Sequence, residues 1–283
     1  MFPSDRSCFV FVYINGILIT VGSIEYFVCS LLYNYFFNRV ILFLGLLSIF
    51  SMRNYGLVYL IEQGTANKKK ICEVNRIEPE QQYPGEFNLS LITTTSIEAL
   101  THMYIYSCMT FEMDLSYSIL CNLVLFIPIS FLFEIIFDFS HYWGHRMLHH
   151  PVIYRYFHKV HHRFLYPTSM TTFYQDPVDL LITNSVPTLF AVSMIPRISY
   201  LMLHWILIYK NFIEISGHCG KIAYPSASFP QCIWIPRILG IDLYTENHDL
   251  HHSLNNCNYA KRFSLWDKVF GTYRSSYYNE DVE

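Results

Sequence analysis

Seven of the thirteen histidines in this chain lie within one stretch, residues 138–162 (DFSHYWGHRMLHHPVIYRYFHKVHH). Across the whole sequence, three groups of histidines recur at intervals of three or four residues, which places the imidazoles of each group on one face of a helix. The groups are His141, His145 and His149; His158, His161 and His162; and His248, His251 and His252. Three such faces in one chain indicate a shared ligand, and a metal is the natural one.

Neutral imidazole binds iron, zinc, copper and nickel, so histidine spacing alone leaves the metal open. A pair at i and i+4 can chelate one ion, whereas adjacent histidines can serve two neighbouring ions. Eight or more histidines exceed the coordination of one tetrahedral or octahedral centre, and we therefore expect a two-ion site. A ligand histidine also needs an acceptor for its second ring N–H, a role for which Asp138, Glu246 and Asp249 are placed.

The remaining histidines have different surroundings in the sequence. His102 and His204 stand alone within apolar runs, where we expect packing residues. His150 lies on the face opposite His145, where we expect a surface residue. His218 follows the last apolar run, in the segment EISGHCG, and from there it could reach the cluster from the membrane side.

Composition predicts an integral membrane protein. Of the 283 residues 52% are hydrophobic and only 14% are charged, against roughly 25% charged residues in soluble domains. The net charge of −3 and the lack of a basic cluster beyond residues 68–70 argue against a nucleic-acid partner. The eight cysteines are scattered singly, which is typical of buried reduced thiols and not of a disulfide scaffold or a structural zinc site.

Six apolar runs predict an all-α fold, an integral membrane helical bundle with a histidine-rich helical cap on the cytosolic face. The runs are residues 8–37, 40–61, 89–111, 115–133, 178–195 and 198–215. Residues 62–88 are polar and contain three consecutive lysines, so we expect a solvated cytosolic linker. If the runs cross in pairs, the linker and all three histidine groups lie on the same side of the membrane.

At these histidines the sequence resembles the fatty acid hydroxylase/sterol desaturase superfamily of membrane di-iron oxygenases, above all its sterol 4-methyl oxidase, sterol 5-desaturase and cholesterol 25-hydroxylase branches. The resemblance extends over about residues 131–274. The matching segments are HRMLH (145–149), HKVHH (158–162) and HDLHH (248–252), the last leading into NCNYAKRFSLWDKVFGTYR (256–274).

Carried over by position, the resemblance implies a set of histidine ligands. They are His145, His149, His158, His161, His162, His248, His251 and His252. His141 lies one turn before the first segment, as in the 4-methyl oxidases, and His218 stands where many members have a histidine, so both join the predicted metal ligands. Two positions depart from the pattern: Asp176 precedes Pro177 where many members have histidine, and Cys219 replaces serine or aspartate.

The resemblance also implies a function. It predicts two iron ions, dioxygen as co-substrate, and hydroxylation or desaturation of a sterol or fatty-acyl lipid in the endoplasmic reticulum membrane. No G-x-G-x-x-G fingerprint or fused His-Pro-Gly-Gly segment occurs, so the electrons are expected from an external donor of the cytochrome b5 type. We expect residues 1–115 to form a membrane-spanning region with a polar linker, and residues 116–283 to form the catalytic region.

Two other functions fit the histidines alone. A two-zinc membrane hydrolase would use the same imidazoles to activate water, without electrons. A membrane protein that binds metal without turnover, either a transporter or a decayed relative, is the other alternative. A transporter should hold its ligands near mid-bilayer, whereas these groups flank the apolar runs. Tyr224, Phe229 and Trp234 are candidates to cover a lipid entry, or else interface anchors.

Overall fold

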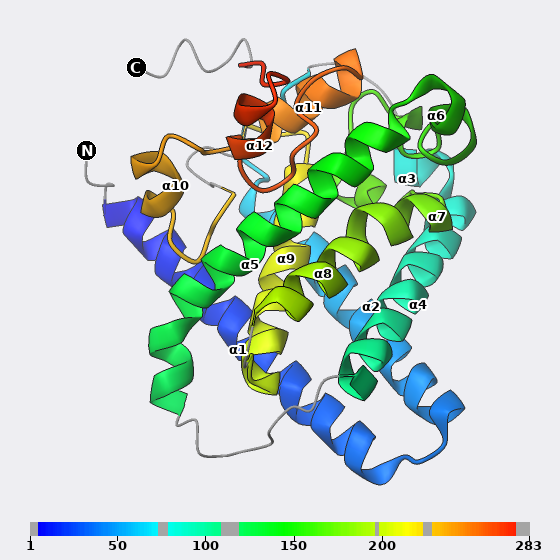
Figure 1. The fold of residues 1–283 in the computed structure, drawn as a ribbon, viewed down its shortest axis with the longest axis vertical. Coiled ribbons are helices and arrows are strands. Elements are labelled where there is room, and N and C mark those ends of the chain that lie inside the picture. Colours follow the sequence, from blue (N-terminus) through cyan, green and yellow to red (C-terminus); the bar gives the residue numbers. More distant parts are fainter. Residues whose placement is uncertain (1–4, 73–78, 109–118, 196–197, 223–227, 276–283) are drawn as a thin grey trace.

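A computed structural model of the chain describes residues 5–72, 79–108, 119–195, 198–222 and 228–275. These residues form helices and no β-strand; one isolated antiparallel bridge joins Lys70 to Lys221. The long helices lie side by side, and the short helices gather at one end (Figure 1). The all-α fold predicted from the sequence is therefore confirmed.

Six long helices make up the bundle in the described part of the chain, one of them built from three consecutive segments. They are α1 (Asp5–Tyr35), α2 (Arg39–Gly64), α4 (Pro84–Cys108), α5 (Ile119–Leu148), α7 (Pro177–Leu180) continuing through the π-helix η3 (Leu181–Ser185) into α8 (Val186–Met194), and α9 (Tyr200–Gly217). Helix α1 packs on α9, α2 on α4, and α5 on α8. Their contacts form one large apolar core.

Local sequence sets where several of these helices begin. Asn38 caps α2, because its Oδ1 accepts the backbone N–H groups of Val40 and Ile41. Asp176 caps α7 in the same way, with Pro177 in the first turn, where its missing N–H costs nothing. The departure at Asp176 thus acts as a helix cap in this chain.

Four segments of the described chain are long and apolar enough to cross a membrane. They are Phe11–Tyr35, Arg39–Gly64, Ile119–Leu148 and Pro177–Met194. Helices α4 and α9 correspond to the other two predicted runs but fall outside this set. They carry polar residues into the bundle, among them Glu98 on α4 and Lys210 and Glu214 on α9. Of the six predicted apolar runs, four are thus candidate membrane spans in the described chain.

The short helices form a cap at the end of the bundle where α5 and α9 finish (Figure 1). They are α3 (Pro79–Gln82), α6 (Pro151–Phe157), the 3₁₀ turns η1 (His161–Arg163) and η2 (Ser169–Phe173), α10 (Trp234–Ile238), α11 (Thr245–Leu254) and α12 (Leu265–Val269).

The polar linker lies at this same end of the molecule. Ile71 donates its backbone N–H to Gly220 over 3.0 Å, and Ile222 donates to Lys69 over 2.8 Å. The linker is more ordered than the expected solvated segment, because α2 runs on to Gly64 and α4 already begins at Pro84. Residues 73–78 lie outside the described part of the chain.

Two smaller expectations need correction. The seven cysteines whose side chains the structure describes are free; Cys29, Cys219 and Cys257 are buried as expected, but Cys108 and Cys121 are exposed. Phe229 is fully buried against Phe131 and Phe263, so it does not cover a lipid entry. Trp234 packs on Phe11 of α1, and Tyr224 lies outside the described residues.

The close approach of α5 to η3 gives a test of the packing. A Cβ added at Gly144 would lie 2.9 Å from Ile182 Cγ2 and 3.1 Å from the Ile182 carbonyl oxygen, and that backbone atom cannot move independently. We expect Gly144→Ala to destabilise the protein by about 1–3 kcal/mol, in the range of other overpacked sites. Thermal unfolding in detergent measures the effect.

Gly56→Ala is the matched control, since Gly56 also lies within a long helix, α2, and a Cβ there meets nothing within 4 Å. This control should be neutral or slightly stabilising, because alanine favours helix more than glycine does. Equal melting temperatures for the two variants would contradict the tight contact between α5 and η3.

Candidate metal centre

The cap gathers nine histidines into two groups. Within each group the potential ligand nitrogens all lie within 4.8 Å of one another. The first group contains His145, His149, His158, His162 and His251, and the second contains His161, His218, His248 and His252. All nine side chains are buried except His149, which is partly exposed. The two groups therefore form pockets of imidazole nitrogen that are almost closed to solvent.

Five different segments supply these side chains. His145 lies in the last turn of α5, and His149 follows one turn later, with its backbone N–H on the His145 carbonyl. His158 ends α6, and His218 ends α9. The other five come from the 3₁₀ turn η1 and from α11; they are His161 and His162, and His248, His251 and His252.

The adjacent histidines of η1 and those of α11 are divided between the two groups. His161 belongs to the second group and His162 to the first, and His251 and His252 divide in the same way. The rings of His162 and His252 are 4.5 Å apart between centroids, so the two groups are immediate neighbours. The H-x-x-H-H spacing thus places ligand nitrogens around two adjacent points, as expected for a two-ion site.

Hydrogen bonds on the far side of several rings fix which nitrogen is free. The Nδ1 of His145 lies 2.7 Å from the Tyr259 carbonyl oxygen, and the Nδ1 of His251 lies 2.7 Å from that of Cys257. A carbonyl oxygen only accepts hydrogen bonds, so these Nδ1 atoms carry the proton. In a neutral ring the Nε2 atom then holds a bare lone pair directed into the group.

These lone pairs face one another at short range. The Nε2 atoms of His145 and His158 are 3.0 Å apart, and the Nδ1 of His158 is itself engaged, 2.8 Å from Asp179 Oδ2. Two acceptors at this distance repel unless a cation lies between them. In the second group His218 Nδ1 is 2.8 Å from the Glu214 carbonyl oxygen, which leaves its Nε2 as an acceptor, and this Nε2 lies 2.9 Å from that of His248. The donor sets therefore fit a bound metal ion in each group.

Burial keeps these imidazoles neutral. It lowers the pKa of His218 to about 3, helped by the nearby positive charge of Lys261. Burial likewise lowers the pKa of His251 to about 3. The pKa values of the other four histidines on η1 and α11 also fall well below the usual range, first through burial and then through their histidine neighbours. The neutral form that binds metals is thus the form present at physiological pH.

Comparison with known proteins agrees with this geometry. The sequence model of the fatty acid hydroxylase family matches residues 130–272, about half of the chain. This chain belongs to the fatty acid hydroxylase family. The match contains both histidine groups entirely and confirms the resemblance seen in the histidine segments.

Curated relatives of this fatty acid hydroxylase family member include enzymes of sterol metabolism. The chain is 35% identical over 139 residues to methylsterol monooxygenase 1 of Rattus norvegicus, covering 49% of this chain and 44% of the relative. It is 30% identical over 146 residues to the C-4 methylsterol oxidase of Schizosaccharomyces pombe, covering 50% and 45%. It is 31% identical over 147 residues to a Delta(7)-sterol 5(6)-desaturase of Gibberella zeae, covering 50% and 37%.

These alignments have a limited extent. The chain spans about half the length of the curated relatives it matches. No solved structure matches it.

The predicted ligand His141 lies in neither histidine group of this hydroxylase family member. Its Nδ1 donates to the Thr183 carbonyl oxygen over 2.7 Å, and its Nε2 is buried without a hydrogen-bond partner. Its ring lies 5.1 Å from that of His145, so it borders the first group. His141 remains a predicted ligand that the two groups do not include.

The isolated histidines lie where the sequence placed them. His102 and His204 pack together inside the bundle, with ring centroids 5.0 Å apart, and His204 Nδ1 lies 2.9 Å from a carboxylate oxygen of Glu25. His150 is exposed and precedes α6. None of the three belongs to either metal-binding group.

The predicted role of Asp138 is wrong. Its carboxylate accepts the backbone N–H groups of three consecutive residues, Lys261, Arg262 and Phe263, and not a histidine N–H. It thereby holds the segment whose Tyr259 carbonyl orients His145. Of the other two carboxylates, Glu246 has an Oε2 atom that is buried without a hydrogen-bond partner.

Asp179 is the carboxylate that sequence reasoning missed. It is buried in α7 and holds His158 through Nδ1. Its position in the sequence could have revealed this role, because Asp179 lies just inside the apolar run 178–195. A carboxylate there is energetically costly in a membrane and usually has a specific partner.

We expect Asp179→Asn to weaken metal binding by the first group about 10- to 100-fold, as other losses of a carboxylate that orients a ligand histidine do. Metal content per protein after dialysis against a graded chelator measures the change. Asp176→Asn is the matched control, because asparagine also caps helices well and Asp176 touches no histidine of either group. Metal retention equal in the two variants would show that Asp179 does not support the site.

The low pKa values predict how the metal-free protein responds to acid. Below pH about 6.5 an unfolded chain protonates these histidines, whereas folded His218 and His251 stay neutral down to about pH 3. The unfolded state then binds more protons, so the free energy of unfolding should fall as the pH is lowered through this window.

Below pH about 6.5 the loss should be about 1.4 kcal/mol per pH unit for each of His218 and His251. Chemical denaturation between pH 8 and pH 5 measures it. His150→Ala, which removes an exposed histidine, should leave the slope unchanged. A stability that is constant over this range would contradict the buried neutral state.

Proposed function

We propose that this protein is a membrane-bound di-iron oxidoreductase that uses dioxygen and externally supplied electrons to hydroxylate or desaturate a lipid. A sterol or a fatty-acyl chain is the substrate class. The observation that carries the proposal is the pair of adjacent, buried histidine groups whose Nε2 atoms converge to about 3 Å, with two bare lone pairs facing each other between His145 and His158. The family membership and the named activities of the relatives point to the same chemistry.

The chain's own residues bind, orient and shield the metals. The nine grouped histidines would hold two irons, with His141 as a further ligand beside the first group. When bound, iron supplies the activation of dioxygen needed to break an unactivated C–H bond. Carbonyl and carboxylate acceptors fix the ligand rings in place. The burial of these rings excludes water from the reaction.

Ligand number favours iron over the two-zinc hydrolase. Zinc sites in proteins are mostly four-coordinate, and catalytic ones keep a position open for water. The first group alone offers five imidazoles, which exceeds a tetrahedral shell and suits a metal of higher coordination number. The transporter alternative is disfavoured because the groups lie in the cap, at one end of the bundle and not at its middle (Figure 1).

We propose the endoplasmic reticulum membrane as the location, with the cap on the cytosolic side. The three consecutive lysines at residues 68–70 lie at the cap end of the bundle, which the positive-inside rule assigns to the cytosol. A cytosolic cap is also open to an external electron donor of the cytochrome b5 type. The stretch 139–175, which supplies five of the grouped histidines, carries four Arg or Lys residues and no Asp or Glu, so it would attract an acidic donor.

The test compares lipid profiles of cells that lack the protein, express it, or express His161→Ala. We expect an oxidised lipid product that appears only with the native chain, because His161 belongs to the second group. His150→Ala is the matched control and should retain the product, since His150 is exposed and outside both groups.

Metal analysis of the purified protein completes the test. We expect bound iron and dioxygen uptake that depends on added reductant. Bound zinc without dioxygen uptake, or identical lipid profiles in all samples, would overturn the oxidoreductase proposal.

A further inference from the structure

A small cavity lies inside the bundle, between α2, α4, α9 and the α7–η3–α8 segment. Its volume is about 50 Å³, enough for a few water molecules or for one polar group with its adjoining carbons. Phe50, Ile97, Ile105, Leu180 and Leu207 are among its apolar lining residues. Apolar walls with a few convergent polar groups are typical of sites for small molecules.

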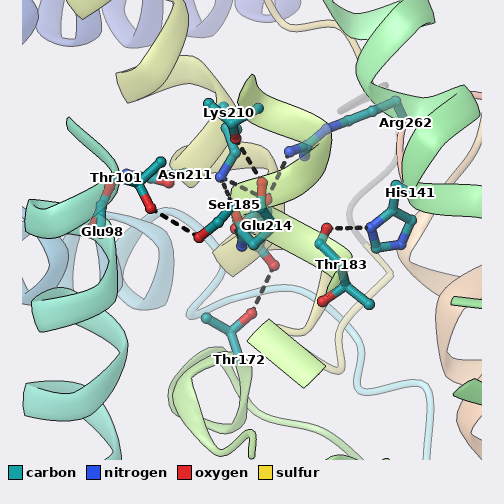
Figure 2. Close-up of polar contacts among 12 residues, drawn as sticks. Glu98, Thr101, His141, Thr172, Thr183, Ser185, Lys210, Asn211, Glu214 and Arg262 are labelled. Atoms are coloured by element: carbon teal, nitrogen blue, oxygen red, sulfur yellow. Dashed lines mark hydrogen bonds and ion pairs between the residues drawn. The ribbon is translucent and has the colours of Figure 1, made fainter. Parts of the chain in front are cut away.

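Two hydroxyl groups that are hydrogen-bonded to each other form part of the cavity wall. Thr101 of α4 and Ser185 of η3 both line it, and their hydroxyl oxygens are 2.9 Å apart, as Figure 2 shows. Ser185 and its neighbour Asn184 belong to the π-helical turn, a rare form that often marks functional sites. On the other side of the same turn, the Thr183 carbonyl accepts from His141. One helical irregularity therefore faces both the cavity and His141, which borders the first histidine group.

The charges that line the cavity cancel. Arg53 and Lys210 are positive, Glu98 and Glu214 are negative, and they are the four Asp, Glu, Lys or Arg residues in its lining. Arg53 contacts Glu98 at 2.5 Å, and Lys210 contacts Glu214 at 3.1 Å. An ionised ligand would lose its hydration without gaining a net countercharge, which is unfavourable in a buried site. A neutral group that both donates and accepts hydrogen bonds suits this lining.

One side chain both lines the cavity and contacts a histidine of the second group. Thr172 lines the cavity, and its hydroxyl oxygen lies 2.7 Å from His218 Nδ1. On its other flank the cavity borders α4, where Ile97 and Thr101 are half-buried and the Glu98 side chain is 25% exposed. A lipid molecule entering beside α4 would therefore meet the polar groups close to the histidines.

We propose that this cavity is a subsite for the hydroxyl end of a neutral lipid alcohol, with Thr101 and Ser185 as its hydrogen-bonding partners. The inference rests on the proposed function, since it assigns the subsite to the lipid that the metal centre oxidises. It narrows the substrate class to lipids that carry an alcohol near the carbon to be oxidised, and it excludes free carboxylates and phosphates from this position.

Equilibrium binding to the purified full-length protein in lipid nanodiscs tests the proposal without turnover. The probes are a radiolabelled sterol alcohol, a long-chain fatty alcohol, the sterol hydrocarbon that lacks the hydroxyl, and the sterol sulfate ester. We expect at least one alcohol to bind more tightly than the hydrocarbon and the sulfate, and the two alcohol arms distinguish a sterol from an acyl-chain ligand.

Thr101→Val should weaken binding of the preferred alcohol about fivefold, the effect of one hydrogen bond, and leave the hydrocarbon unchanged. Thr93→Val is the matched control. Both threonines lie on α4 and donate to the carbonyl four residues earlier, over 2.8 Å from Thr101 and 2.9 Å from Thr93, but Thr93 does not line the cavity. The control should bind all four probes as the native protein does.

Glu98→Gln tests the charge balance independently. It removes one negative charge from the cavity while keeping the size of the side chain. The affinity for the sulfate ester should therefore rise about tenfold relative to the affinity for the alcohol. Equal binding of alcohol and hydrocarbon by the native protein, or unchanged alcohol binding in Thr101→Val, would overturn the subsite and leave a cavity that holds water only. Metal content and product formation are measured separately, so failure of the oxidoreductase proposal would be distinguishable from failure of the subsite.

Discussion

The structure depends on the orientation of neutral imidazole rings by acceptors that are not themselves ligands. A neutral ring whose Nδ1 donates to a carbonyl or carboxylate oxygen must present a bare Nε2, and this chain brings two such nitrogens, of His145 and His158, to 3.0 Å from each other. Without cations these lone pairs repel. The cap is therefore a scaffold for a bound charge, and folding and metal binding should be coupled in it.

Much of the scaffold serves one irregular segment, residues 257–263. Asp138 accepts the N–H groups of its last three residues, and Asp267 accepts those of Tyr259 and Ala260. With its N–H groups fixed, the segment directs the Tyr259 carbonyl to a histidine on α5 and the Cys257 carbonyl to one on α11. A short loop thus sets ring orientations in two helices that are far apart in the sequence. Asp138 and Asp267 act on the metal site through this backbone, whereas Asp179 contacts His158 directly.

The sequence predicted the helices and the histidine ligands better than the tertiary contacts between them. Histidine spacing identified eight of the nine grouped residues, and apolar runs located every long helix in the described chain, because both patterns depend on local helical geometry. The ninth, His218, was predicted from its place after the last apolar run and from the family resemblance. Spacing could not show that α5 ends before His149, or that Asp138 binds backbone while Asp179 holds His158, because these depend on tertiary contacts. The same reason explains α4 and α9: Glu98, Lys210 and Glu214 lower the hydropathy of their helices, yet each finds an opposite charge inside the bundle.

The charged residues of the bundle and the histidines of the cap are both buried, but the energetic cost of burying them is compensated in different ways. Within the bundle, charges are neutralised by other protein charges: Arg53 lies between Glu25 and Glu98, and Glu214 between Lys210 and Arg262. Removing the shared central charge of such a set leaves buried charges uncompensated, which costs about 3–5 kcal/mol for a buried ion pair. In the cap, the histidines stay neutral and leave their lone pairs uncompensated, so the balancing charge must come from outside the chain. Thr172 stands where these two sets of residues meet, bonded to Glu214's carbonyl on one side and to His218 on the other. The charges that line the cavity are paired with one another, so they do not compete with the histidines for the metal ions. The cavity can therefore hold an uncharged lipid group close to the metals.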